Sequence, residues 1–244
     1  MNQRPKLLDL FCCAGGAAMG YHLAGFDVVG VDIKPQPRYP FTFIQGDALE
    51  YLAEHGAEFD AIHASPPCQA YMDTNKNGAK PSKHPRLIEP TRTLLDQLGK
   101  PYVIENVHLA PLRASLMLCG TMFGLRVIRH RYFELSFGAP LTMSCYHWGQ
   151  VASGEFIGSY AFGGRGHRHG KGLRDGPPMP PQVTKAQAMG IDWMVDKELN
   201  EAIPPAYTQF IGPYLLQQVA VQQSFTADVL LSCEAQTGSE IAHG

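Results

Sequence analysis

A cysteine that directly follows a proline pair is the best-placed candidate nucleophile of this chain. Cys68 comes after Ser65-Pro66-Pro67, which ends a mostly apolar run from Phe59 to Ala64. Proline has no N–H to donate to a sheet, so the run is predicted to be a strand that stops there. Ligands of open α/β sheets bind at the carboxyl ends of the strands. Cys68 is therefore a candidate nucleophile, with a small buried hydrophobic residue as the alternative.

A carboxyl group and a pair of guanidinium groups are predicted to lie at the same edge. The apolar run Tyr102-Val103-Ile104 closes on Glu105, and glutamate is seldom buried without a partner. The run from Arg126 to Leu135 is predicted to be one strand, with Arg129 and Arg131 on one face. Such a pair suits an anion or a base carbonyl. The alternatives are an exposed helix cap for Glu105 and an exposed edge of charge for the arginines.

The N-terminal segment has the pattern of a nucleotide-binding βαβ unit. An apolar run from Lys6 to Phe11 leads into a turn of small residues, a predicted helix from Ala17 to Ala24, and a strand from Phe26 to Val31 that ends on Asp32. An acid at that strand end is placed to bond ribose hydroxyls. The spacing is not G-x-G-x-x-G, and an ordinary tight turn is the alternative reading.

A third segment, from Phe41 to Ala48, is predicted to be another strand that ends on an acid, Asp47. Asp47 either faces the same crevice or caps a helix predicted from Ala48 to His55.

Two polar segments interrupt this pattern. Residues 70–89 are expected to form a long loop, either a lid or a solvated linker. Residues 151–175 hold four Lys or Arg against two acids, within a Gly-, Pro- and His-rich stretch. That composition fits nucleic-acid contact, or a flexible surface loop. Helices are predicted from Val183 to Met189, Asp196 to Ala202 and Ala206 to Val221, followed by a loose tail after Ser224.

The totals describe a globular chain of 244 residues, with 45% hydrophobic and 17% charged residues. A net charge of −2 does not indicate a strongly basic nucleic-acid binder, but a local basic patch can suffice. There is no apolar run of about 18 residues and no signal-peptide pattern, so an intracellular protein is expected. The six cysteines include no C-x-x-C pair, so the spacing indicates thiols and no zinc site.

Together these segments resemble the cytosine-C5 methyltransferases that use S-adenosylmethionine, in matching order over nearly the whole chain outside the variable middle and the tail. The matching elements are DLFCCAGG (Asp9 to Gly16), Asp32, Gly46-Asp47-Ala48, Pro67-Cys68-Gln69, Glu105-Asn106-Val107, Arg129-His130-Arg131, the stretch from Gln187 to Trp193, and Ile203-Pro204-Pro205. Cys13, Val127 and Glu201 depart from the family's glycine, glutamine and asparagine. The middle segment is shorter than in most restriction-system members, which favours a short or relaxed recognition sequence.

The resemblance implies an α/β fold: a Rossmann-like class I methyltransferase sheet with helices on both faces and a small irregular target-recognition insertion. The expected parts are a catalytic and cofactor-binding core (1–137), a target-recognition segment (138–182), a return to the core (183–224) and a tail (225–244). The implied partner is double-stranded DNA, with no membrane and no metal. A monomer in the cytoplasm of a bacterium or a virus-infected host cell is expected.

The resemblance also implies residue roles. Cys68 would add to cytosine C6, with its pKa lowered by positive charge; Glu105, with a raised pKa, would engage N3; Arg131, with Arg129, would hold O2. The base would be flipped out of the duplex. The implied S-adenosylmethionine site comprises Phe11, Ala14, Gly15, Gly16, Asp32, Ile33, Asp47, Ala48 and Pro67. The implied nucleic-acid contacts are Gln69, Lys76, Lys83, Arg165, His167, Arg168 and Lys171.

Three other functions are weighed against this one. A tRNA cytosine-C5 methyltransferase would keep the same chemistry. A nicotinamide-dependent oxidoreductase would share the βαβ unit but needs neither Cys68 nor Glu105, and its glycine spacing differs. A catalytically inactive nucleic-acid-binding module would tolerate loss of these two residues, and both are present.

Overall fold

A seven-stranded sheet forms the centre of the molecule, with strand order β3-β2-β1-β4-β5-β8-β6. The computed structural model describes residues 3–71, 84–146, 157–158 and 184–240, with side chains described except at 157–158 and 226–240. The strands are β1 (Lys6–Leu10), β2 (Asp27–Asp32), β3 (Thr42–Gln45), β4 (Ala61–Ala64), β5 (Tyr102–Asn106), β6 (Ser115–Leu118) and β8 (Arg131–Leu135).

The pairing creates a switch point between β1 and β4. Strands β1 to β5 pair in parallel, and β8 runs antiparallel to both β5 and β6. The chain builds outward from β1 to β3, then returns to place β4 on the other side of β1. Leu10 of β1 is level with Val31 of β2 and Ala64 of β4, so the loops that follow these strands emerge together. Crevices at such switch points are where ligands bind in open α/β sheets.

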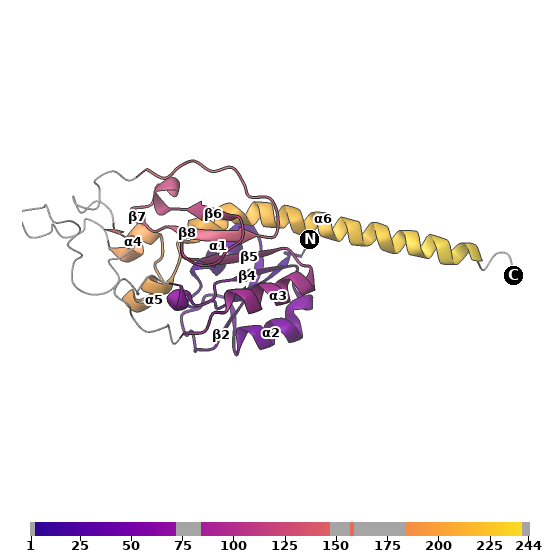
Figure 1. The fold of residues 1–244 in the computed structure, drawn as a ribbon, viewed down its shortest axis with the longest axis horizontal. Coiled ribbons are helices and arrows are strands. Elements are labelled where there is room, and N and C mark those ends of the chain that lie inside the picture. The colour runs from indigo at the N-terminus through magenta and orange to yellow at the C-terminus, as the bar shows by residue number, and fades with distance from the viewer. Residues whose placement is uncertain (1–2, 72–83, 147–156, 159–183, 241–244) are drawn as a thin grey trace, which may run out of the picture.

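Helices cover both faces of the sheet, as Figure 1 shows. On one face lie α1 (Gly16–Ala24) and α6 (Pro205–Glu240); on the other lie α2 (Ala48–His55) and α3 (Ile88–Leu98). Successive residues of a strand point to opposite faces. Leu7 accordingly packs in the cluster with Tyr21 and Tyr207, whereas Leu8 packs in the cluster with Leu52 and Leu95. The expected fold class is therefore confirmed.

Close contact between α1 and α6 requires a residue without a side chain. A Cβ on Gly20 would collide with Thr208 and with the carbonyl oxygen of Pro205. Thr208 Oγ1 uses this proximity to donate a hydrogen bond of 2.8 Å to the carbonyl oxygen of Ala17. The segment after the Ile203-Pro204-Pro205 element is thereby fixed to the helix that follows the small-residue turn.

Smaller elements complete the described fold. Two short helices, α4 (Lys185–Met189) and α5 (Asp196–Glu201), precede α6, and β7 (Val127–Ile128) pairs with β9 (Ile157–Gly158) in a separate sheet. Short 3₁₀ turns are η1 (Gly56–Glu58), η2 (Cys68–Ala70) and η3 (Gly120–Phe123).

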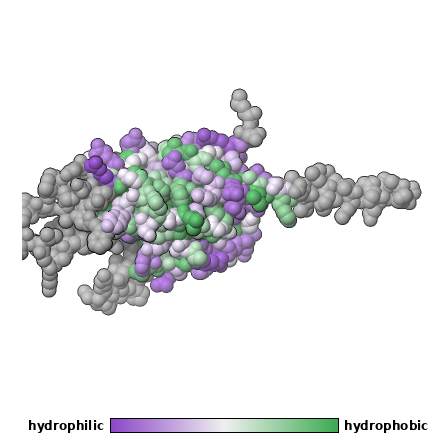
Figure 2. Space-filling view, turned by 90° about the horizontal axis from the view of Figure 1, so that it is seen from above, coloured by the Kyte–Doolittle hydropathy of each residue, from purple (hydrophilic) through white to green (hydrophobic). Residues whose placement is uncertain are grey.

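Two expectations about elements are wrong. The predicted strand from Arg126 to Leu135 is two strands, β7 and β8, which belong to different sheets and are separated at Arg129 and His130. The expected loose tail after Ser224 is helical as far as Glu240, because α6 continues through it. Figure 1 shows this helix leaving the globule, and Figure 2 shows hydrophobic side chains near its base, where Val221 and Phe225 are exposed. Among the described residues, no helix has the length and apolar character needed to cross a membrane.

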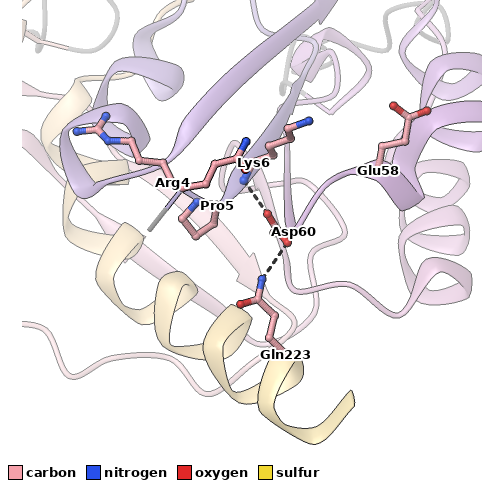
Figure 3. Close-up of a pocket in the computed structure, with 7 residues that line it drawn as sticks. Arg4, Pro5, Lys6, Glu58, Asp60 and Gln223 are labelled. Atoms are coloured by element: carbon pink, nitrogen blue, oxygen red, sulfur yellow. Dashed lines mark hydrogen bonds between the residues drawn. The ribbon is translucent and has the colours of Figure 1, made fainter. Parts of the chain in front are cut away.

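The opposite end of the sheet, at the start of β1 and β4, holds a pocket of about 370 Å³ (Figure 3). Asp60 lies at its centre and accepts hydrogen bonds from the backbone N–H of Lys6 (2.7 Å) and from Gln223 Nε2 (3.0 Å). These bonds tie α6 to the amino ends of the strands, away from the switch-point crevice.

A buried ion pair holds α3 against β8. Arg92 donates to both carboxylate oxygens of Glu134 at 2.7 Å, and the two side chains are only 1% and 2% exposed. Glu134 also accepts from the backbone N–H of Arg113 at 2.7 Å, and Arg92 donates to the carbonyl oxygen of Pro111. A pair with this many partners is costly to break from one side, because the remaining charge stays buried.

Replacement Arg92→Met is expected to lower the free energy of unfolding by about 3–5 kcal/mol, since it leaves the Glu134 carboxylate buried without its counter-charge. Urea unfolding monitored by circular dichroism measures this loss. Arg113→Met is the matched control: its ion pair with Asp96 is exposed, and the expected loss is below about 1 kcal/mol. Equal losses for the two variants would contradict the assignment, and Arg92→Met/Glu134→Leu should recover stability relative to the single variant.

Candidate active site

The sheet brings the four residues expected to be catalytic to one place. Cys68 begins the turn after β4, Glu105 lies in β5, and Arg129 and Arg131 flank the start of the antiparallel strand β8. Arg131 Nε is 2.9 Å from Glu105 Oε1. Cys68 lies within electrostatic range of Glu105 and of both arginines. The antiparallel direction of β8 thus delivers the arginines to the end of β5 where Glu105 lies.

Glu105 is buried, and one of its oxygens has no hydrogen-bond partner in the described part of the chain. The residue is 7% exposed. Its contact with Arg131 is short, but Oε1 receives no hydrogen bond of acceptable geometry from the described residues. The contact is therefore a charge interaction rather than an aligned hydrogen bond. Burial raises the pKa of Glu105, and Arg131, Ser65 and Arg129 oppose the increase. The raised direction is the expected one.

A chain of buried polar side chains leads to Glu105 from the interior. Tyr21 Oη lies 3.0 Å from His63 Nδ1, His63 Nε2 lies 2.9 Å from Ser65 Oγ, and Ser65 hydrogen-bonds Glu105. Burial lowers the pKa of His63 to about 3, so the ring is neutral. With Glu105 ionised, Ser65 donates to it and accepts from His63 Nε2–H. With Glu105 protonated, the donors reverse along the chain.

Sequence reasoning did not identify this network. His63 and Ser65 are separated by one residue, which places them on one face of the strand and its extension. A histidine and a serine at this spacing, at the end of a predicted buried strand, could have indicated the network.

Asn106 fixes the loop that carries Cys68. Its Nδ2 donates to the carbonyl oxygen of Pro66 at 2.8 Å, and its Oδ1 accepts from the backbone N–H of Val107 at 2.9 Å. The residue is 1% exposed. The asparagine beside Glu105 therefore joins the ends of β4 and β5.

The expected lowering of the Cys68 pKa is wrong for this structure. Burial raises the pKa of the thiol, and Glu105 adds to the increase, while Arg131 and Arg129 act in the opposite direction. Positive charge is present as expected, but desolvation outweighs it.

The turn after β1 has the geometry of a ligand-binding loop. Phe11 and Cys13 have positive φ angles of 58° and 45°, and Gly15 has a φ of 83°. Asp32 Oδ2 accepts from the backbone N–H of Cys13 at 3.0 Å, so the acid at the end of β2 holds this loop. Trp193 Nε1 donates to the carbonyl oxygen of Ala14 at 2.9 Å. Trp193 is thus a positioning residue that the expected site did not include.

The other expected cofactor residues have varied surroundings. Ile33, next to Asp32, is 66% exposed, which leaves an apolar side chain available beside a buried acid. Gly16 and Ala48 are buried, and Pro67 is half-buried. Asp47 Oδ1 accepts from the backbone N–H groups of Leu49 and Glu50 at 2.8 and 3.1 Å, so the helix-cap alternative is confirmed.

Of the expected nucleic-acid contacts, only Gln69 can be placed. It is exposed beside Cys68. The others, which lie outside the described residues, are Lys76, Lys83, Arg165, His167, Arg168 and Lys171.

Two departures from the family pattern lie against each other. Cys13 Sγ is 3.9 Å from Glu201 Oε2. Burial raises the pKa of Cys13, and the charges of Asp32 and Glu201 add to the increase, so the group beside Glu201 is a neutral thiol. The position that carries a glycine in the family has a left-handed backbone in this chain, which explains why glycine suits it.

A second buried acid lies beneath the turn. Asp9 is fully buried in β1; its Oδ2 accepts from Tyr39 Oη at 3.3 Å, and its Oδ1 has no partner among the described residues. Burial raises its pKa to about 8, with a smaller contribution from Asp32. The group is therefore largely protonated near neutral pH.

The raised pKa of Asp9 makes stability depend on pH. Unfolded chains lose this proton near pH 4 and the folded protein near pH 8, so folding holds one extra proton in between and stability falls as pH rises. Asp9→Asn removes this dependence. Its stability relative to the parent should grow by up to about 1.4 kcal/mol per pH unit between about pH 5 and 8.

Urea unfolding at several pH values measures this difference. Asp27→Asn, at an exposed position of β2, controls for loss of a carboxylate. A difference between Asp9→Asn and the parent that does not vary with pH would show that Asp9 is ionised in the folded protein.

The chain is similar in sequence to known methyltransferases. No family model matches the chain. The chain is 30% identical over 146 residues to the type II methyltransferase M.XorII of Xanthomonas oryzae pv. oryzae, covering 53% of this chain and 31% of that protein. It is 32% identical over 119 residues to the type II methyltransferase M.AquIA of Picosynechococcus sp., covering 42% and 48%. The matched segments span less than half of each relative.

Solved structures share the fold. A DNA modification methyltransferase encoded within an Escherichia coli prophage superposes with a TM-score of 0.56 at 15% identity, covering 88% of this chain and 99% of that one. The Entamoeba histolytica methyltransferase EhMeth superposes with a TM-score of 0.56 at 14% identity and the same coverage. The relation in sequence to type II methyltransferases, together with this shared fold, confirms the resemblance of the chain to the cytosine-C5 DNA methyltransferase family.

Proposed function

We propose that the protein is a DNA (cytosine-5-)-methyltransferase that transfers a methyl group from S-adenosylmethionine to a cytosine flipped out of a duplex. The observation that carries this proposal is the cluster of Cys68, Glu105 and Arg131, which come from the turn after β4, from β5 and from the start of β8. A thiol, a buried carboxyl group with an oxygen available to a ligand, and a guanidinium group are what attack on a pyrimidine requires.

The cofactor site is proposed at the adjoining turn. The buried Asp32 and exposed Ile33 suit the polar ribose and the flat adenine of an adenosine, and the left-handed turn around Cys13 and Gly15 allows close approach of the backbone. S-adenosylmethionine, when bound there, supplies an electrophilic methyl group.

The protein's own part in the reaction begins with Cys68. Its thiolate adds to C6 of the cytosine, which breaks the aromaticity of the ring and places carbanion character on C5. Glu105 donates a proton toward N3, and Arg131 holds O2, so the charge that develops on the ring is stabilised. Once C5 is methylated, a base removes the C5 proton, the C6–S bond breaks with its electron pair leaving on Cys68 as the thiolate, and N3 returns its proton to Glu105.

The structure suggests how a thiol with a raised pKa becomes a nucleophile. Glu105 raises the pKa of Cys68 through its negative charge, and burial raises the pKa of Glu105 itself. Net transfer of the thiol proton to Glu105 makes the carboxyl neutral and leaves a thiolate beside Arg131. The same step prepares Glu105 as a proton donor. We infer that base binding, which excludes water and adds a hydrogen-bond acceptor at Glu105, drives this exchange.

The choice of DNA as the substrate is supported by the relatives, which are type II methyltransferases and a prophage-encoded DNA modification methyltransferase. Exposed Gln69 lies beside Cys68, where a flipped base would leave the duplex. The segment 138–182 is proposed to contact the groove and phosphates.

Incubation with labelled S-adenosylmethionine and, separately, duplex DNA or tRNA tests the proposal. Label is expected in DNA at C5 of cytosine. Cys68→Ser should reduce labelling to background, and Glu105→Gln should slow it about 10²–10⁴-fold. Cys233→Ser is the matched cysteine control and should retain activity.

Duplex DNA containing 5-fluorocytosine at the modified position should trap a covalent complex, because fluorine cannot leave C5 as a proton does. Mass spectrometry is expected to place the adduct on Cys68. Label on tRNA alone would overturn the substrate and keep the chemistry. Cofactor binding without transfer to either nucleic acid would favour a binding module.

A further inference from the structure

Three residues whose side chains can bind a metal lie together near the start of β8. Cys119 lies between β6 and η3, His130 between β7 and β8, and Cys145 in the irregular segment that follows β8. Their candidate ligand atoms all lie within 4.8 Å of one another. Cys119 is fully buried and the other two residues are half-buried. None of the three takes part in the chemistry proposed above.

The separation of two of these ligand atoms is close to that in a tetrahedral metal centre. Cys145 Sγ is 3.4 Å from His130 Nε2. Metal–sulfur and metal–nitrogen bonds of zinc, about 2.3 and 2.0–2.1 Å long, would place two ligands at tetrahedral angles about 3.6 Å apart. Cys145 and His130 are therefore spaced as two ligands of one ion would be, and Cys119 Sγ lies within 4.8 Å of both ligand atoms.

The surroundings of Cys119 also favour a thiolate ligand. Thr121 Oγ1 donates a hydrogen bond of 3.4 Å to Cys119 Sγ. A hydrogen-bond donor at the sulfur stabilises a thiolate, which is the form in which cysteine binds a metal.

We propose that Cys119, His130 and Cys145 form a binding site for Zn²⁺, with two thiolates, one imidazole nitrogen and a solvent molecule as the fourth ligand. Thiolates and imidazole are the donors that zinc prefers, whereas Mg²⁺ and Ca²⁺ require oxygen ligands. Binding forms three metal–protein bonds and releases the two thiol protons to solvent. The resulting unit of Zn²⁺ and two thiolates has no net charge, which suits its partly buried position.

The bound ion would position the neighbouring arginines and would take no part in the reaction itself. His130 lies between Arg129 and Arg131, so a metal bond to its ring would hold the two arginines beside Glu105 and Cys68. Through Cys145, which lies in the first part of the proposed recognition segment (138–182), the same ion would join that segment to the end of β6. Metal binding itself does not depend on the proposed function, because it is measured without substrate.

Metal content of the purified full-length chain tests the proposal directly. The protein is reduced, loaded with Zn²⁺ and dialysed against metal-free buffer. Elemental analysis is expected to find about one zinc per chain. Replacement by Co²⁺ should give the absorption of a tetrahedral ion and a thiolate-to-cobalt charge-transfer band. Loading should also raise the thermal unfolding temperature, because the ion binds the folded state.

Variants assign the ligands. Cys119→Ser, His130→Ala and Cys145→Ser should each lose the charge-transfer band or shift it, and should retain at least tenfold less zinc at equal free Zn²⁺. Cys68→Ser, a cysteine change outside the cluster, is the matched control and should bind zinc as the parent does. Circular dichroism shows whether each variant is folded.

Three results would overturn the site: no zinc retained by the folded parent, equal zinc in the cluster variants and the parent, or a Cys119–Cys145 disulfide in protein isolated without reductant. Failure of DNA labelling with zinc bound would reject the proposed function and leave this site standing.

Discussion

A carboxyl group held away from water between a thiol and two guanidinium groups is the constraint on which the active end of this protein depends. Burial makes ionisation of Glu105 unfavourable. Protonation of Glu105 removes the negative charge that otherwise acts on Arg131 and Cys68. Each group therefore sets the protonation of the others. Ser65, His63 and Tyr21 extend this dependence into the core through hydrogen bonds whose direction follows the state of Glu105. Such a cluster is a set of coupled titrations rather than a list of independent residues.

Strand β8 connects that cluster to a buried ion pair. As the antiparallel strand between β5 and β6, it is held near its start by Arg131 against Glu105 and near its end by Glu134 against Arg92. The second contact is bidentate and almost fully buried, so it fixes the register in which the first is made. A contact of the proposed active site and a structural contact thus share one short strand. The proposed metal site would add a third attachment, at the residue between the arginines.

Local pattern was sufficient for most of the fold. The strands that end at or next to Asp32, Ser65 and Glu105 could be placed because each is an apolar run bounded by a polar residue or proline, and parallel order then brings their ends together. Three features could not be derived in this way. The break at Arg129 and His130 results from pairing with different sheets. The pKa of Cys68 is set by desolvation, which sequence does not reveal. The cluster of Cys119, His130 and Cys145 has no short spacing, because residues from three separate segments form it.

The contact between Cys13 and Glu201 couples substitutions at these two positions. Both residues depart from the family pattern, they are 188 positions apart, and they are in contact at the turn after β1. A change at one of them alters the space and charge that the other meets, so their effects on stability and binding should not be additive. Across related chains we therefore expect these two positions to change together, with glycine and asparagine inherited as one pair and cysteine and glutamate as another.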